Sequence, residues 1–165
     1  MVLAPERYQD KEYETPRCVL EAAGHTVFTT STVHHAQGGL GGSTVVDVLL
    51  KEVDPVSYDA IVFVGGSGAH LYFDDPTAHG LARSFYEAEK LTTAICAGPS
   101  ILANAGLLKG KKATCFPSQE ENLKAHGAQV TGQPVEQDGF LITANGPMAA
   151  EAFGEKIAEA LQSRS

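Results

Sequence analysis

The sequence predicts a three-layer α/β sandwich, in which a mainly parallel central sheet carries helices on both faces. Apolar runs of β type alternate along the chain with segments of helical periodicity, and the clearest run, 60–64 (AIVFV), ends in a glycine turn. Strands that alternate with helices pair in parallel, and helices then cover both faces of the sheet. Because 165 residues suffice for one hydrophobic core, we expect a single domain over residues 1–165.

The first third of the chain contains fewer clear elements than the rest. Residues 1–5 (MVLAP) leave room for only a short first strand. Apolar residues at helical spacing predict a helix over 12–24, which ends at a glycine, and 25–31 (HTVFTTS) is typical of a strand. Residues 36–43 are rich in glycine but lack the lysine of a phosphate-binding loop, so we expect a plain loop and no nucleotide site.

From residue 60 onward the alternation is regular, and a Ser118–Glu121 pair indicates a helix N-terminus. An Asp138–Gly139 pair indicates a tight turn between two short strands. We expect strands over 60–64, 91–96, 112–116 and on both sides of residues 138–139, and helices over 76–90, 98–106, 117–127 and 148–162.

The composition excludes several classes of partner. Twelve basic residues against twenty acidic ones give a net charge of −8, which argues against nucleic acid and anionic membranes. No run approaches the roughly 18 apolar residues of a membrane span, and no signal peptide is recognisable. The three cysteines are odd in number and lack metal-like spacing, so we expect reduced thiols, a cytoplasmic location and no metal site.

Cys96 stands where a predicted strand passes directly into a predicted helix. Ligands of α/β proteins bind beyond the carboxyl ends of the strands, so a side chain at this turn is expected to point into a site. Such a turn needs small neighbours, and Ala94 and Gly98 flank the cysteine at the spacing of a nucleophile elbow. A helix N-terminus stabilises a thiolate, so a lowered pKa is expected for Cys96. The alternative is a small, inert core thiol.

A second glycine turn, residues 65–68, ends the preceding buried strand. Glycines there allow the backbone to approach a bound group closely. The N–H group of Gly66, together with that of Ala97, could form an oxyanion hole. The alternative is an ordinary strand-to-helix turn.

Three stretches, 94–110 (AICAGPSILANAGLLKG), 58–68 (YDAIVFVGGSG) and 10–27 (DKEYETPRCVLEAAGHTV), resemble the ThiJ/PfpI family, which includes the parkinsonism-associated protein deglycase. The resemblance extends over residues 2–161. It implies a flavodoxin-like sandwich and a homodimer. It also implies that Glu12, four residues before Pro16 and twelve before Gly24, lies beside the nucleophile, with a raised pKa and a general acid/base role. Without the resemblance, Glu12 would be interpreted as a solvated first-turn residue.

The sequence departs from the family pattern at the histidine positions. Ala97 follows the cysteine, and Phe116 stands where the deglycase branch has histidine, so a PfpI-type protease activity is not expected. His70 is a possible auxiliary residue, although a lone histidine in such a place is more often structural. Cys115 is a possible resolving thiol, or else a buried bystander.

Two functions follow from this pattern. In the first, Cys96 attacks a small reactive carbonyl or amide-type compound, Glu12 transfers the proton, and no cofactor is needed, as in a glyoxalase or deglycase of the stress response. In the second, Cys96 is a redox sensor that oxidises without turnover. A chaperone-like role is a further alternative.

Overall fold

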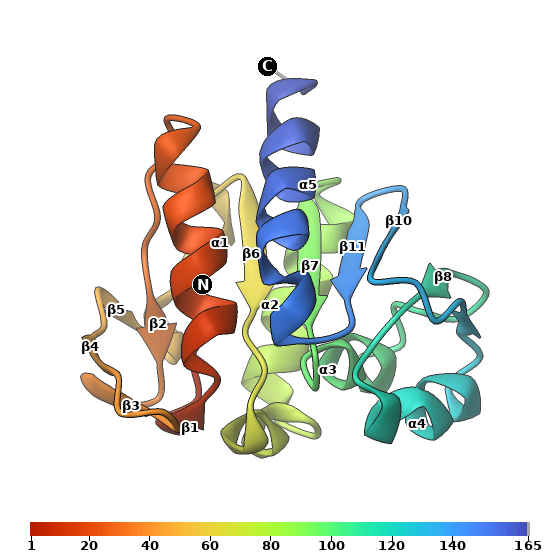
Figure 1. The fold of residues 1–165 in the computed structure, drawn as a ribbon, viewed down its shortest axis with the longest axis horizontal. Helices are drawn as coiled ribbons and strands as arrows, with labels where there is room; N and C mark the ends of the chain where they lie inside the picture. The colour runs from red at the N-terminus through yellow and green to blue at the C-terminus, as the bar shows by residue number, and fades with distance from the viewer. Residues whose placement is uncertain (165) are drawn as a thin grey trace.

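The computed structural model describes residues 1–164, and its centre is a parallel sheet (Figure 1). Ile61 of one strand lies beside Thr92 of the next, and Ala94 of that second strand lies beside Thr143 of a third. The three strands therefore end at the same edge of the sheet. One edge strand is antiparallel and leads into a turn in which Gly139 has a φ of 62°, as the sequence predicts. The strands are β6 (Ala60–Phe63), β7 (Leu91–Ile95), β11 (Leu141–Ala144) and the antiparallel β10 (Val135–Asp138).

The first residues of the chain lie in the middle of this sheet. Val2 forms parallel bridges with Phe63 on one side and Thr30 on the other. It thereby connects β6 to two short parallel strands, β2 (Thr30–Ser31) and β5 (Val48–Leu49). The strand expected over 25–31 is therefore limited to its last two residues.

Helices cover both faces of the sheet, which confirms the predicted three-layer sandwich. Figure 1 shows α1 (Asp10–Ala22) and α5 (Ala150–Gln162) side by side in front of it. These two helices approach closely at Gly154, where an added Cβ would lie 2.9 Å from the Cα of Pro16. The opposite face carries α2 (Pro76–Glu87), α3 (Pro99–Asn104) and α4 (Glu120–Ala125). One apolar cluster is buried mainly between the sheet and the helices α2 and α3, and a second between the sheet and α5.

Residues 36–43 are not a plain loop, and that prediction was wrong. They belong to a hairpin of β3 (His35–Gly38) and β4 (Ser43–Val45), and β3 also pairs in parallel with β1 (Glu6–Tyr8). The carboxylate of Asp10 closes the turn, since it accepts the N–H groups of Leu40 (2.8 Å) and Gly42 (2.7 Å). The side chain of Asp10 therefore already accepts hydrogen bonds from the N–H groups of the glycine-rich turn.

The segment after α3 is also less regular than predicted. The strand expected over 112–116 is limited to β8 (Lys112–Ala113), which pairs with β9 (Gln129–Val130). The Ser118–Glu121 capping interaction does not form, because a 3₁₀ turn over Pro117–Gln119 precedes α4. Other 3₁₀ turns span Leu50–Glu52, Pro55–Ser57, Ser67–Tyr72 and Pro147–Ala149.

Candidate active site

Cys96 lies at the carboxyl end of β7, in the turn that leads into α3. Its backbone has a φ of 63°, a left-handed conformation that few residues other than glycine adopt. Its N–H group donates to the carbonyl of Ala144 (2.9 Å), and its carbonyl accepts from the N–H group of Phe116 (2.9 Å). A Cβ at Gly98 would lie 2.6 Å from the carbonyl oxygen of Phe63, so the small flank is required. Hydrogen bonds to Ala144 of β11 and to Phe116 after β8 therefore fix the backbone of Cys96.

Glu12 reaches the cysteine from the first turn of α1. The side-chain oxygen of Gln9 caps this helix by accepting the N–H groups of Lys11 (2.7 Å) and Glu12 (3.2 Å). The Glu12 side chain is fully buried, and its Oε1 accepts the N–H group of Gly65 (3.1 Å). The carboxyl group lies next to the side chain of Cys96, since a Cβ added at Gly65 would lie within 2.4 Å of Oε1 of Glu12 and 2.8 Å of the Cβ of Cys96. The structure therefore brings together the two residues that the sequence analysis named as the catalytic pair.

The environment of the pair raises both pKa values. Burial raises the pKa of Glu12 to about 7, and hydrogen bonds from Cys96 and Gly65 limit this rise. Burial also raises the pKa of the Cys96 thiol, and the charge and hydrogen bond of Glu12 raise it further. This direction is opposite to the lowered thiol pKa expected from the sequence. The reason is that Cys96 is only 8% exposed and faces a carboxylate. Together these raise the thiol pKa by more than the N-terminus of the six-residue helix α3 lowers it.

The raised pKa values favour a pair that holds one proton between sulfur and carboxylate. The Oε2 atom of Glu12 is buried and has no hydrogen-bond partner among residues 1–164. A buried carboxylate oxygen without a donor is a good proton acceptor. Glu12 can therefore take the proton of the thiol when the sulfur reacts, and the net charge of the pair stays at −1.

The N–H groups of Gly66 and Ala97, the two residues named for an oxyanion hole, favour the thiolate of Cys96 and so limit the rise of its pKa. Gly66 has a φ of 103°, and an added Cβ would lie 2.5 Å from the carbonyl oxygen of Arg7 and from the nitrogen of Gln9. Only glycine fits at this position. The two donors point to the place where negative charge forms at or beside the sulfur.

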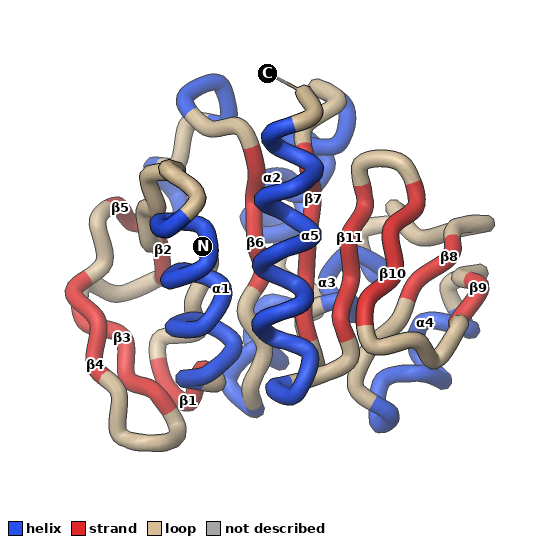
Figure 2. Tube along the Cα trace, turned by 45° about the horizontal axis from the view of Figure 1, so that its top comes forward, coloured by secondary structure: helices blue, strands red, loops and turns tan. Residues whose placement is uncertain are grey.

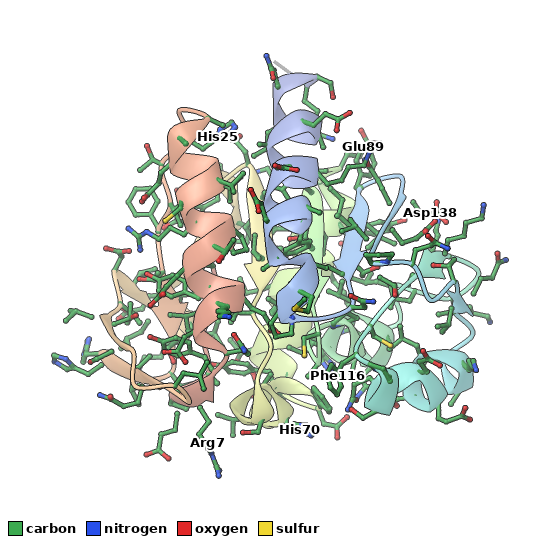
Figure 3. The ribbon with its side chains drawn as sticks, viewed as in Figure 1. Arg7, His25, His70, Glu89, Phe116 and Asp138 are labelled. Carbon is green, nitrogen blue, oxygen red and sulfur yellow. The ribbon has the colours of Figure 1, made fainter. Side chains whose placement is uncertain are left out.

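The two auxiliary candidates differ from the buried pair in their surroundings. His70 is exposed and stacks on Phe73 with ring centroids 4.4 Å apart, and Figure 3 shows it at the lower edge of the molecule. Cys115 is a free thiol, and burial raises its pKa to about 12. It packs in the apolar cluster under α2 and α3, whereas Cys96 packs in the cluster under α5. Phe116 is 42% exposed, in the position where the family resemblance implies histidine.

Two residues have roles in the site that the sequence analysis did not assign, namely Gln9, which was not named, and Gly65, which was named only as part of a glycine turn. The side chain of Gln9 fixes the helix turn that presents Glu12, and the N–H group of Gly65 holds the carboxylate. A polar residue before a helical pattern is a common cap, so Gln9 could have been found.

Within residues 1–164, no three His, Cys, Asp or Glu side chains gather as a metal site would require. In the same range, no helix combines the length and apolar character needed to cross a bilayer.

The fold and the site define an α/β sandwich protein with a cysteine at a strand-to-helix elbow and a buried glutamate beside it. The family model described as the DJ-1/PfpI family matches residues 1–160, and the chain belongs to this family. This confirms the resemblance seen in the sequence.

Relatives and solved structures cover nearly the whole chain. An uncharacterised protein of Methanocaldococcus jannaschii is 39% identical over 98% of this chain and 81% of its own length. A Thermococcus kodakarensis protein named as a deglycase is 31% identical over 89% of each chain. The crystal structure of a ThiJ/PfpI domain protein from Brachyspira murdochii superposes with a TM-score of 0.97 and 36% identity, over 99% of this chain and 95% of that one.

Proposed function

We propose that the protein is a cysteine-dependent enzyme of the stress response that converts small reactive carbonyl compounds, in the manner of a glyoxalase or deglycase. The observation that carries the proposal is the position of the fully buried carboxyl group of Glu12 next to the side chain of Cys96. A nucleophile beside a proton acceptor, with two N–H donors facing it, contains the parts needed for covalent catalysis at a carbonyl carbon. The deglycase name of one relative supports the substrate class.

The reaction with methylglyoxal begins when the sulfur of Cys96 attacks the aldehyde carbon while its proton passes to Glu12. The carbonyl oxygen becomes an alkoxide near the N–H groups of Gly66 and Ala97, and Glu12 returns the proton to that oxygen. The product of this step is a hemithioacetal. Glu12 then transfers a proton from C1 to C2, and the hydroxyl proton on C1 passes to the oxygen on C2, so that the hemithioacetal becomes the thioester of a 2-hydroxy acid. Water hydrolyses this thioester to the hydroxy acid and the free thiol. The sum is one methylglyoxal and one water converted to lactate and one proton.

Turnover of methylglyoxal by purified variants tests this proposal. Cys96→Ala is expected to lose all measurable activity, and Glu12→Gln is expected to lose about 10²–10⁴-fold in kcat. Cys18→Ser is the matched control, because Cys18 is an exposed thiol on α1, and its activity should equal that of the wild type. Undiminished turnover in Cys96→Ala would refute the proposal.

Reversible oxidation of Cys96 is the second candidate function. The N–H groups of Gly66 and Ala97, which face the sulfur, are suited to hold the oxygen of a sulfenate or sulfinate formed by peroxide. Mass spectrometry after mild peroxide treatment separates this candidate from simple damage. Selective oxidation of Cys96 supports it, whereas oxidation of Cys18 or Cys115 with Cys96 intact eliminates it.

We also propose a homodimer in the cytoplasm. The hairpin of β3 and β4 exposes two large apolar side chains, Leu40 and Val45, each 69% exposed. Exposed apolar side chains gathered in one place favour association between protein surfaces. Light scattering of the wild type and of Leu40→Asp with Val45→Asp tests this proposal, which requires the mass of the double variant to fall to half.

A further inference from the structure

Two large apolar side chains are exposed at the edge of the sheet where Cys96 lies. Phe116, which follows β8, is 42% exposed, and Met148, in the 3₁₀ turn between the end of β11 and the start of α5, is 99% exposed. Figure 3 shows Phe116 toward the lower edge of the molecule, to which the arrows of β6, β7 and β11 point in Figure 1. Exposed apolar side chains that lie beside a reactive group favour the binding of apolar ligand groups there.

The backbone of Phe116 is fixed on both sides although its ring is exposed. Its N–H group donates to the carbonyl of Cys96 (2.9 Å), and its carbonyl accepts the N–H group of Gln119 (2.8 Å). The side chain of Gln119 in turn accepts a hydrogen bond from the hydroxyl of Ser100 (2.7 Å), which is fully buried in the first turn of α3. An aromatic ring on a fixed backbone loses little conformational entropy when it binds a ligand.

The ring of Phe116 lies against the segment that joins β11 to α5, which Figure 2 shows passing along the same edge. A Cβ added to Gly146, in this segment, would lie 3.6 Å from Cδ1 of Phe116. Ala149, at the end of the segment, packs with Cys96 in the apolar cluster under α5. Met148 comes directly before Ala149. One segment therefore contacts the ring of Phe116, carries Met148 and packs in the cluster of the nucleophile.

We propose that Phe116 and Met148, which we call the apolar rim, bind the substituent of the electrophile that reacts at Cys96, and that the site prefers an aromatic or large apolar substituent. This rests on the proposed function and narrows its substrates to dicarbonyl compounds such as phenylglyoxal, in which a phenyl group replaces the methyl group of methylglyoxal. A phenyl group packs on the ring of Phe116 edge to face or offset, and the flexible, polarisable side chain of Met148 adapts to it. Phenylalanine in place of the histidine that the family resemblance implies removes a hydrogen-bonding group from this surface.

The first experiment measures kcat/KM for phenylglyoxal and for methylglyoxal. Both substrates react at an aldehyde carbon beside a ketone, so the ratio of the two values cancels general damage to the chemistry. This ratio should fall about 3–10-fold from the wild type in Phe116→Ser and in Met148→Ser, whereas Phe116→Leu, which keeps an apolar side chain, should retain most of it. Val56→Ser is the matched control, because Val56 is an exposed apolar residue in the turn before β6, at the opposite edge of the sheet. A ratio that is unchanged in both Phe116→Ser and Met148→Ser would overturn the proposal.

A second experiment needs no turnover, and it compares the alkylation of Cys96 by iodoacetamide and by N-phenyliodoacetamide. Cys18→Ser and Cys115→Ser leave one reactive thiol, and N-acetylcysteine gives the intrinsic rate ratio of the two reagents. The protein should favour the phenyl reagent beyond this intrinsic ratio, and Phe116→Ser should return to it. A protein that favours the phenyl reagent but turns over no dicarbonyl compound would overturn the proposed function alone. An enzyme that converts methylglyoxal but shows only the intrinsic ratio would overturn the apolar rim alone.

Light scattering distinguishes the apolar rim from a contact between copies of the chain. If a second copy covered Phe116 and Met148, serine at these positions would lower the mass in solution. We expect Phe116→Ser and Met148→Ser to keep the mass of the wild type, as Val56→Ser does. A lower mass in the first two variants would overturn the proposal.

Discussion

The side chains of Glu12 and Cys96 lie on either side of one glycine, Gly65. A Cβ added to Gly65 would lie 2.4 Å from Oε1 of Glu12 and 2.8 Å from the Cβ of Cys96. The same glycine donates its N–H group to that Oε1 atom. The separation of the carboxyl group and the sulfur therefore depends on a residue without a side chain.

Gly65→Ala should damage both the site and the fold. The new methyl group would also lie 2.7 Å from the carbonyl oxygen of Ile95, which is backbone and cannot move freely. We expect a loss of about 1–3 kcal/mol in the free energy of unfolding, with reduced turnover. Gly80→Ala is the matched control, because an added Cβ in that exposed α2 position meets nothing within 4 Å. It should stabilise the protein by about 0.5–1 kcal/mol. Urea denaturation of both variants measures the contrast.

Glu12 should make the stability of the protein depend on pH. Its pKa is about 7 in the folded protein and near its ordinary value of 4.5 in the unfolded chain, so the folded state binds more protons between these values. The free energy of unfolding should therefore fall by about 3 kcal/mol as the pH rises from 4.5 to 7. Glu12→Gln should lose this contribution and exceed the wild type at pH 8 while matching it near pH 4. Urea denaturation at both pH values checks the sign, and a wild type more stable at pH 8 would contradict it.

Removal of the Glu12 charge should lower the pKa of the Cys96 thiol. In the wild type the carboxylate raises this pKa, both by its charge and by its hydrogen bond. The rate of alkylation by iodoacetamide should therefore reach its midpoint at a lower pH in Glu12→Gln than in the wild type. Both proteins should carry Cys18→Ser and Cys115→Ser, so that only one thiol reacts. A midpoint that stays in place would mean that Glu12 and Cys96 do not interact in solution.

Asp10 should matter more for stability than its position in the first turn of a helix indicates. It is 6% exposed and accepts two backbone N–H groups of the β3–β4 turn. Asp10→Ala would leave these donors without a partner, at a cost of about 2–5 kcal/mol. Glu14→Ala, an exposed change on the same helix, should alter stability by less than about 0.5 kcal/mol. Thermal denaturation and the exchange rates of the Leu40 and Gly42 amides test both.

The sequence was sufficient to predict the layers of the fold and to name Cys96 and Glu12 as neighbours. The strong apolar runs at 60–64 and 91–96 form the central strands, because burial on both faces demands such runs. The elbow at Cys96 could be recognised from small residues at fixed spacing, whereas Glu12 was named only because the family resemblance implies its position beside the cysteine. These features are local along the chain.

Features that depend on contacts between distant segments could not be predicted. The turn of the β3–β4 hairpin is closed by Asp10, from a helix some thirty residues earlier, so residues 36–43 alone indicated a loop. The thiol pKa depends on how deeply Cys96 is buried and on the charge of Glu12, and neither is visible in the turn itself. The position of His70 on the ring of Phe73, away from the pair, follows from a 3₁₀ turn that the sequence did not indicate.

The left-handed backbone of Cys96 means that a cysteine at this position lowers the stability of the fold. A side chain in that conformation costs on the order of 1 kcal/mol relative to glycine, which every folded molecule carries permanently. Replacement of the cysteine by glycine would therefore remove this strain together with the sulfur. If the proposed chemistry of Cys96 were no longer needed, glycine would become the favoured residue at this position.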